Sequence, residues 1–290
     1  MNDMSSSTTR LAELRNQLDA IDNQIHDLLM QRAKVVESVA TQGGKKGTKI
    51  RPGREATIMR RLLARHSGSW PAQAIVRIWQ EIFGAALIIE GGQTLAICGG
   101  DDEAEARLGL AREYFGPLTP IRRYHSPSQT LSDLTREGGA QLAVMPSPQE
   151  SDDAAHGGWW TMLTATDPAL YVIMKLPFWK PRAEGLPICD AYVVASIPPD
   201  PSGADHGLIL MGFQAEISRA RISEQVAAAG FVPKALWVRR QPDNAQLLAL
   251  VEVDGLVDNA DPRLTQIAGL DMPPRVIGGY ALPITKGIVE

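Results

Sequence analysis

The stretch LRNQLDAIDNQIHDLLMQRAKVVESV, residues 14–39, repeats apolar side chains at alternating spacings of three and four residues. The pattern begins at Leu11, and no glycine or proline interrupts it before Gly43. This period predicts one amphipathic helix of about 30 residues with a seam like that of a coiled coil. Such a helix is roughly 45 Å long, too long for two short helices to cover, so we expect it to dimerise. The first ten residues are expected to form a loose tail.

One seam position carries a charge. Continuing the pattern from Leu28 reaches Arg32, so a guanidinium stands where a leucine is expected. A buried cation without an anion is costly, and Arg32 therefore requires a negatively charged partner within the packed interface. Pairing with an acid such as Asp27 or Glu37, or extension of the side chain toward solvent, is the simpler interpretation.

Two shorter helices are predicted next. Pro52 and Gly53 precede one at about 54–66, and the other runs from about 71 to 90 with a wide apolar face. The run KKGTKIRPGREATIMRR, residues 45–61, holds seven basic residues against one acid, Glu55. A nucleic-acid patch, a solvated helix face and a pocket for a small polyanion all fit such a run.

Charge and composition bear on that choice. Residues 1–90 carry 13 Lys and Arg against 9 Asp and Glu, a balance of +4, whereas the remainder carries 16 against 24, or −8. The basic run has no aromatic residue for stacking bases, and the rest of the chain is acidic, so nucleic acid is disfavoured. Arg60, Arg61 and Arg65 are expected to form a solvated helix face.

The three expected helices resemble the all-helical chorismate mutases, which form intertwined dimers and convert chorismate to prephenate. The resemblance covers about residues 11–90 and rests on the stretch 14–39, the run RPGRE at 51–55 and the last helix. It implies an isomerase without cofactor or metal, because the reaction is a pericyclic shift within one substrate. The polyanion pocket is the interpretation that this resemblance favours for Arg54, Glu55 and one loop lysine.

The resemblance also implies roles for individual residues. Arg15 matches an arginine contributed by the neighbouring subunit, while Arg32 and Arg54 match arginines that each hold one substrate carboxylate. Glu55 matches the acceptor of a hydrogen bond from the ring hydroxyl. Glu90 falls where the family places a Gln or Glu facing the ether oxygen. Glu90 would act there only as a protonated donor, which predicts a preference for mildly acidic pH; a solvated residue in the last turn is the alternative.

Three positions depart from the family pattern. The lysine expected on the ether oxygen falls at Gly43, and a short local shift would give the role to Lys45 or, second, to Lys46. Arg51 stands where some members have an Asp. Ala86 stands where some carry a Ser that contacts a carboxylate.

The spacing of Arg15 and Arg32 has a geometric consequence. They are 17 positions apart on one predicted helix, which is about 25 Å. One small dianion cannot contact both in a single chain. A shared site therefore requires an antiparallel partner helix that delivers its own Arg15.

The remaining residues alternate strands and helices up to a linker at 198–205. Strands are expected at 94–100, 120–125, 141–146, 170–179 and 190–197, with helices at 102–115 and 127–138 and an exposed turn at 152–160. This order predicts an open α/β layer. The acidic run GGDDEAEA is unlike a phosphate-binding loop. From 206 the order βαββαβ is ferredoxin-like, with its second helix near 262–268, and is similar to an ACT domain, a regulatory module that binds amino acids between paired subunits.

The whole order is similar to the bifunctional chorismate mutase/prephenate dehydratases. Pro146 of LAVMPSPQ matches the dehydratase's Pro-Ile-Glu-Asn run, but the Glu-Asn is missing. Cys189-Asp190-Ala191-Tyr192 stands near the position of its essential Thr-Arg-Phe, and WVRRQ stands where phenylalanine-responsive ACT domains have Glu-Ser-Arg-Pro. We therefore predict a mutase domain at 1–92, an inactive dehydratase-like α/β domain at 93–203 and an ACT-like regulatory domain at 204–290.

The leading hypothesis is a dimeric chorismate mutase of phenylalanine and tyrosine biosynthesis. One alternative is a bifunctional mutase/dehydratase, and another is a non-catalytic regulator that senses an amino acid. Two distant cysteines, no apolar N-terminal segment and no apolar run near 20 residues predict a cytoplasmic protein. His125, His156 and His206 lack metal-ligand spacing, and a Ser elbow of the GxSxG type is also missing.

Overall fold

The computed structural model describes residues 2–42, 49–149, 158–182, 184–185, 188–240 and 246–285. Their contacts divide the chain into two compact units. The first consists of helix α1 and the segment Ala85–Gly92 at the end of helix α3. The second contains all the other elements that are described.

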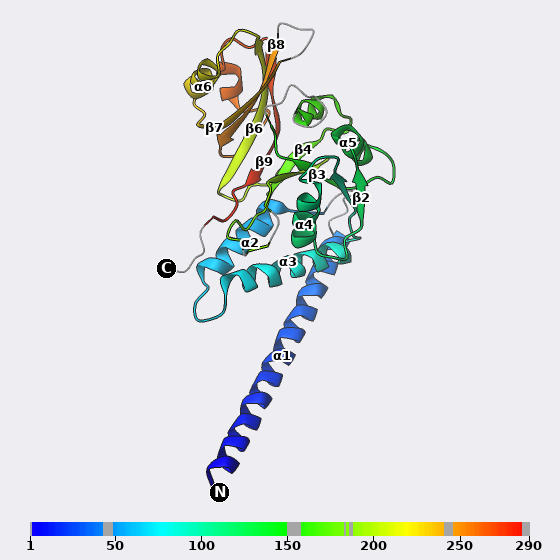
Figure 1. Ribbon diagram of the computed structural model, residues 1–290, viewed down its shortest axis with the longest axis vertical. Coiled ribbons are helices and arrows are strands. Elements are labelled where there is room, and N and C mark those ends of the chain that lie inside the picture. The colour runs from blue at the N-terminus through cyan, green and yellow to red at the C-terminus, as the bar shows by residue number, and fades with distance from the viewer. Residues whose placement is uncertain are drawn as a thin grey trace. The chain divides into compact units, whose positions relative to one another are not determined.

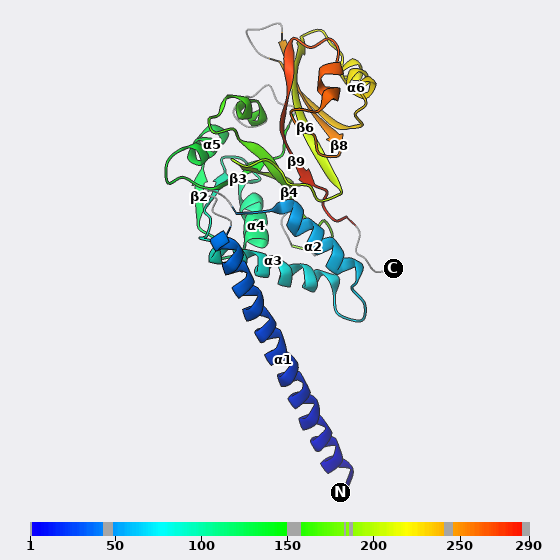
Figure 2. The ribbon, with the colours of Figure 1, turned by 180° about the vertical axis from the view of Figure 1, so that it is seen from behind.

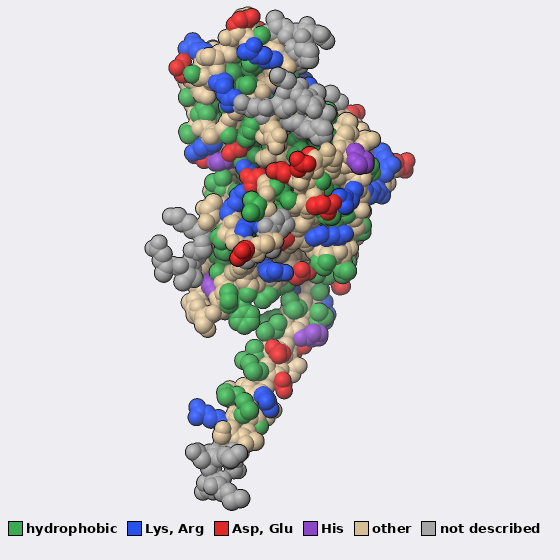
Figure 3. Space-filling view, in the orientation of Figure 1, with side chains coloured by type: hydrophobic (Ala, Val, Ile, Leu, Met, Phe, Trp, Pro, Cys, Tyr) green, Lys and Arg blue, Asp and Glu red, His purple; other side chains and the backbone are tan. Residues whose placement is uncertain are grey.

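Helix α1 (Asn2–Gln42) is one uninterrupted α-helix of 41 residues, shown in blue in Figure 1. The predicted long helix is confirmed, but the expected N-terminal tail is wrong, since the helix already begins at Asn2. Neither glycine nor proline occurs before Gly43, so each further residue adds a hydrogen bond without a break. Ten large apolar side chains between Leu11 and Val39 are 37–62% exposed along this helix, Val36 is half-buried, and Figure 3 shows apolar groups at the helix surface.

Helices α2 (Pro52–Ala64) and α3 (Ala72–Ile89) confirm the two shorter helices. Within the second unit, a cluster of buried residues packs these helices against later parts of the chain: Ala56, Met59 and Leu63 of α2, Val76 and Phe83 of α3, and Phe178, Trp179 and Ala281. Contrary to the expectation from apolar runs, α3 is long and apolar enough to meet the length and composition of a membrane span. Core helices meet the same criteria, and Val76 and Phe83 are core residues here.

Nine strands form one sheet in the order β2-β1-β3-β5-β4-β9-β6-β8-β7 (Figure 1). Strands β1 (Leu95–Cys98), β2 (Ile121–Tyr124) and β3 (Leu142–Pro146) are parallel, with helices α4 (Ala104–Phe115) and α5 (Pro127–Thr135) packed against them. Strand β5 (Ala191–Ala195) is antiparallel to both β3 and β4 (Tyr171–Leu176). The predicted α/β layer is confirmed.

The exposed turn expected at 152–160 is wrong at its C-terminal end. Trp159 and Trp160 begin a 3-10 helix, η1 (Trp159–Ala165), and are 0% and 1% exposed. Residues 152–157 lie outside the described part of the chain. The Trp159 indole donates to the Pro146 carbonyl at 3.0 Å, so its one polar group is satisfied inside the core.

The last third follows the predicted order of elements. Strand β6 (Asp205–Gln214), helix α6 (Arg219–Ala228), strands β7 (Pro233–Arg240) and β8 (Gln246–Asp254), helix η2 (Pro262–Gln266) and strand β9 (Met272–Ala281) succeed one another. The helix expected at 262–268 is a five-residue 3-10 turn. All neighbouring pairs in the order β9-β6-β8-β7 are antiparallel, and Figures 1 and 2 show α6 and η2 on the same face.

The α/β and C-terminal strands belong to one continuous sheet. Val172 of β4 pairs with Gly278 of β9 in parallel register. Gly278 has a φ of +136°, and a Cβ there would lie 2.1 Å from the Val172 carbonyl oxygen, so only glycine permits this approach. The boundary expected near residue 203 therefore does not interrupt the sheet, and the domain boundaries stay predictions.

Candidate active site

Arg15 and Arg32 lie on the same helix. Arg15 is exposed and Arg32 is half-buried, and α1 is helical through both. At 1.5 Å per residue their Cα atoms are separated by about 25 Å along the axis. A single α1 therefore cannot present both guanidinium groups to one small ligand.

The first turn of α2 brings three predicted site residues together. Arg51 immediately precedes the helix, its carbonyl accepts from the Glu55 backbone N–H at 2.9 Å, and Arg51 and Arg54 are both exposed. Glu55 is only 9% exposed, which is unusual for a carboxylate. Three charged groups thus share one helical turn, with the two arginines toward solvent and the carboxylate inside.

Asp200 caps this helix from a distant part of the chain. Arg51, at the N-cap position, makes no side-chain cap. Instead, the backbone N–H groups of Gly53 and Arg54 each donate to one oxygen of the Asp200 carboxylate at 3.0 Å. A carboxylate at a helix N-terminus satisfies unpaired donors and is favoured by the helix dipole. The predicted linker 198–205 therefore holds the turn that carries Arg54 and Glu55.

Tyr114 of α4 fixes the carboxylate of Glu55. The Tyr114 hydroxyl donates to Glu55 Oε2 at 2.7 Å. Burial, with the adjacent Glu55 carboxylate, raises the pKa of Tyr114 well above its usual value, so the phenol stays a donor at neutral pH. Glu55 is accordingly held in one orientation by a neutral partner.

Arg60 departs from the prediction of a solvated helix face. One of its terminal nitrogens donates to the Ser202 hydroxyl at 2.8 Å, and the other donates to the carbonyls of Ala204 and Leu282 at 3.0 and 2.8 Å. The charge is used to bind backbone carbonyls that the fold brings beside α2. Arg61 and Arg65 are exposed, as predicted.

The remaining predicted residues occupy two places. Ala86 and Glu90 are half-buried at the end of α3, where the Glu90 backbone N–H donates to the Ala86 carbonyl at 3.0 Å. They belong to the same compact unit as α1. Lys45 and Lys46, the two candidates for the ether oxygen, lie outside the described residues.

Sequence reasoning missed Tyr114 and Asp200. Neither belongs to a motif, and they are 59 and 146 or more positions from the residues that they hold. One signal was available. Serine, threonine, aspartate and asparagine are the usual N-cap residues, so an arginine before Pro52-Gly53 indicates that the cap comes from elsewhere.

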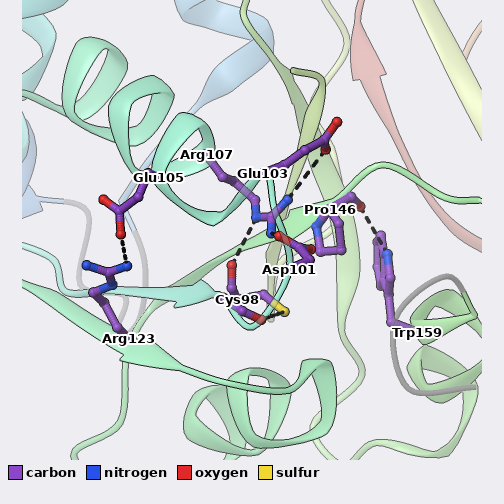
Figure 4. Close-up of polar contacts among 9 residues, drawn as sticks. Cys98, Asp101, Glu103, Glu105, Arg107, Arg123, Pro146 and Trp159 are labelled. Atoms are coloured by element: carbon purple, nitrogen blue, oxygen red, sulfur yellow. Dashed lines mark hydrogen bonds and ion pairs between the residues drawn. The ribbon is translucent and has the colours of Figure 1, made fainter. Parts of the chain in front are cut away.

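A second cluster lies at the carboxyl ends of β1 and β3 (Figure 4). Arg107 of α4 is 0% exposed and donates through Nε to the Cys98 carbonyl at 2.9 Å. Its Nη2 donates to both Asp101 oxygens at 2.5 and 2.7 Å, and its Nη1 lies 3.9 Å from Glu103 Oε2. The buried cation is thus committed to the acids of its own loop.

The cavity beside this cluster has a volume of about 310 Å³ and is lined by Asp101, Asp102, Glu103, Pro146 and Gln149. Three carboxylates line it, so it is electrostatically unsuited to a dianion. Burial raises the pKa of Cys98, and raises that of Cys189 to about 11, so neither thiol is a ready nucleophile at neutral pH. Among the described residues, no group of His, Cys, Asp and Glu has the arrangement of a metal site.

The fold defines the class of protein: a helical N-terminal region that carries several arginines, followed in the chain by an α/β region with a continuous sheet. Residues 14–91 match the family model of chorismate mutase type II. The N-terminal segment is therefore a chorismate mutase type II domain.

Curated relatives extend the similarity beyond that domain. The bifunctional chorismate mutase/prephenate dehydratase of Aquifex aeolicus is 31% identical over 129 residues, 43% of this chain and 34% of the relative. The enzyme of the same description from Stutzerimonas stutzeri is 24% identical over 160 residues, 52% of this chain and 42% of the relative. The matches thus span well under half the length of these relatives.

Solved structures give weaker likenesses. GqqA, described as a novel type of quorum quenching acylase, is 16% identical with a TM-score of 0.48, over 65% of this chain and 94% of that one. Prephenate dehydratase from Arthrobacter aurescens in complex with L-Phe is 13% identical with a TM-score of 0.44, over 67% and 92%. Nothing about function follows from likenesses at this level.

Proposed function

We propose that this protein is a chorismate mutase that converts chorismate to prephenate. The observation that supports the proposal best is the continuity of α1, which places Arg15 and Arg32 about 25 Å apart on one helix. In a pair of antiparallel α1 helices, Arg15 of one chain lies near Arg32 of the other. The site then consists of one chain's residues and the partner's Arg15.

The reaction needs positioning and charge stabilisation. Arg32 and Arg54 hold the two substrate carboxylates through bidentate contacts, which keeps the enolpyruvyl arm folded over the ring. Lys45, with Lys46 as the alternative, and protonated Glu90 donate to the ether oxygen as the C–O bond breaks and charge develops there. Glu55 accepts from the ring hydroxyl, and Arg51 and Ala86 line the same site.

The homodimer forms through α1. The apolar seam between Leu11 and Val39 is exposed along the helix, and contiguous apolar surface of this length marks an interaction site. A second copy of the same seam is the partner whose pattern matches it. Packing of two seams also places Arg32 in the interface, where its guanidinium binds a substrate carboxylate.

Depletion of chorismate by the purified full chain tests the assignment. We expect saturable turnover without added metal or cofactor, and prephenate as the product. The full chain is the proper material because α2 is capped by Asp200 and packed on Phe178 and Trp179, all outside segment 1–92. A full chain that is folded and dimeric yet leaves chorismate unchanged would favour the non-catalytic regulator.

Replacing Glu90 with glutamine should change the pH dependence of the mutase. A glutamine amide donates to the ether oxygen at every pH, whereas glutamate donates only when protonated. An ionised Glu90 loses this donor, so the activity of Glu90→Gln should depend less on pH than that of the wild type. kcat/KM measured from pH 5 to 9 decides the matter, and identical profiles for the two proteins would remove Glu90 from the site.

We also propose that the α/β region, predicted as 93–203, lacks prephenate dehydratase activity. Its cavity at β1 and β3 is lined by three carboxylates, and Arg107 is already bound by Asp101. Prephenate, a dianion, would be repelled there. We expect no phenylpyruvate from prephenate above the uncatalysed rate. Phenylpyruvate formation that Arg107→Met abolishes would instead favour the bifunctional enzyme.

The C-terminal region, predicted as 204–290, is proposed to be an ACT-like module that binds an amino-acid effector. Its βαββ order, short second helix and antiparallel sheet support this proposal. We place the protein in the cytoplasm, a location that two free thiols, Cys98 and Cys189, support.

A further inference from the structure

A second cavity lies between α3 and α4, and none of the predicted mutase residues lines it. Its volume is about 360 Å³, at the lower end of the range for small-molecule pockets. One face of α3 lines it with Gln73, Arg77, Gln80 and Glu81, which recur at helical spacing. Helix α4 contributes Gly109, which offers no side chain to fill the space.

Gln80 is the first sign that this cavity binds a ligand. Its side chain is only 7% exposed and lines the cavity, yet its amide has no hydrogen-bond partner among the described residues. The indole N–H of Trp179, a residue that is 5% exposed and lines the same cavity, also has none there. The Trp179 N–H is enclosed by protein and does not reach the cavity, whereas the Gln80 amide keeps access to it and is free to bind a polar ligand there.

The charges of the lining are the second sign. Arg77 and Glu81 are one turn apart on α3, and within the described chain neither forms an ion pair or a side-chain hydrogen bond. The charged side chains that α4 contributes to the lining already have partners. Arg112 donates to the carbonyls of Pro117 and Thr119, and Glu113 pairs with Arg182.

One unpaired cation and one unpaired anion select among ligand classes. A dianion such as the mutase substrate requires an excess of positive charge, and a polyamine requires an excess of negative charge. The lining has neither, because Arg77 and Arg112 balance Glu81 and Glu113. A net-neutral molecule that carries both charges matches it, and Val76 and Trp179 provide apolar surface beside them.

We infer that this cavity binds a free α-amino acid with an apolar side chain. Arg77 binds the carboxylate, Glu81 binds the ammonium group, and the Gln80 amide hydrogen-bonds to the same head group. The side chain of the ligand packs against Val76 and Trp179. This site is distinct from the ACT-like region and does not depend on the mutase assignment.

Calorimetric titration of the full chain with L-phenylalanine and L-leucine tests the inference. Two matched controls each lack one charge: 2-phenylethylamine has no carboxylate and 3-phenylpropanoate has no ammonium group. We expect saturable binding of at least one amino acid, and binding at least about tenfold weaker for both controls, because each loses a charge-assisted hydrogen bond. Equal binding of a control, or no heat with either amino acid at millimolar concentration, overturns the inference.

Two variants locate the binding. Arg77→Gln removes the cation from an exposed helical position without a loss of helix propensity, and Gly109→Leu fills the cavity from α4. Each should weaken amino-acid binding at least about tenfold. Arg65→Gln is the matched control, with the same charge change at an exposed position outside the cavity, and should bind as the wild type does. Undiminished binding by folded Arg77→Gln would mean that the amino acid binds elsewhere, and the inference would be wrong.

Discussion

Replacing Arg32 with alanine is expected to lower kcat/KM for chorismate by about 30-fold to several-thousand-fold. Loss of one partner from a buried, hydrogen-bonded charge pair costs roughly 2–5 kcal/mol, and here the other partner is a substrate carboxylate. Arg15→Ala should reduce activity in the same way, because in the proposed dimer its guanidinium serves the partner's site. Arg61→Ala is the matched control, since Arg61 is exposed on α2, and its activity should equal that of the wild type.

Mixing the two variants tests whether one site takes Arg15 and Arg32 from two different chains. A mixed dimer of one Arg15→Ala chain and one Arg32→Ala chain holds one site with both arginines intact and one site with neither. Half of the sites in that dimer should therefore recover, after the chains are unfolded and refolded together. Activity of the mixture equal to the mean of the two variants would exclude a site shared between subunits.

Replacing Gly53 with alanine is expected to lower the free energy of unfolding by about 3 kcal/mol or more. A Cβ at Gly53 would lie 2.2 Å from the Asp200 carbonyl oxygen and 2.8 Å from that of Pro201. These are backbone atoms, so α2 has to separate from the 200–201 segment. That movement adds overpacking strain and breaks two hydrogen bonds to the Asp200 carboxylate.

Gly84→Ala in α3 is the control for this substitution. Its Cβ would lie 3.4 Å from the Phe115 carbonyl oxygen, an ordinary contact, so the better helix propensity of alanine should leave stability unchanged or raise it by up to about 1 kcal/mol. Urea unfolding of both variants provides the measurement. Because Arg54 and Glu55 follow Gly53 directly, mutase activity should fall in Gly53→Ala under conditions where it is still folded. Equal stability of Gly53→Ala and the wild type would contradict the packing of α2 on Asp200.

Local patterns were sufficient for most of the secondary structure and for naming candidate site residues, which stay predictions. The spacing of apolar residues predicts α1, because a helix depends on residues three and four positions away and on the absence of breakers. The short apolar runs of the α/β layer likewise predict its strands from neighbouring residues alone. Arg15, Arg32, Arg54, Glu55 and Glu90 were predicted as site residues because a charged residue on an apolar face, or a match to a family motif, is visible in the chain itself.

Errors arose where distant segments meet. Arg60 belongs to a basic run that is typical of a solvated face, yet carbonyls from Ala204 and Leu282 surround its guanidinium. The segment 152–160 was predicted to be an exposed turn because polar and glycine residues precede Trp159 in the sequence. The Trp159 indole is instead buried and donates to the Pro146 carbonyl of β3. Neither partner can be identified without knowing how the chain folds back.

The amino-acid sequence by itself determined the long helix and the order of strands and helices, and it suggested the two arginines for which we propose a second chain. Only the tertiary structure decided that Asp200 caps α2, that Tyr114 holds Glu55, and that Val172 and Gly278 join two predicted domains in one sheet. The physical reason is the sequence separation over which each interaction acts. Helical periodicity and chain breakers act over a few residues, but hydrogen bonds between residues 59 to 147 positions apart exist only after the sheet has brought their segments together.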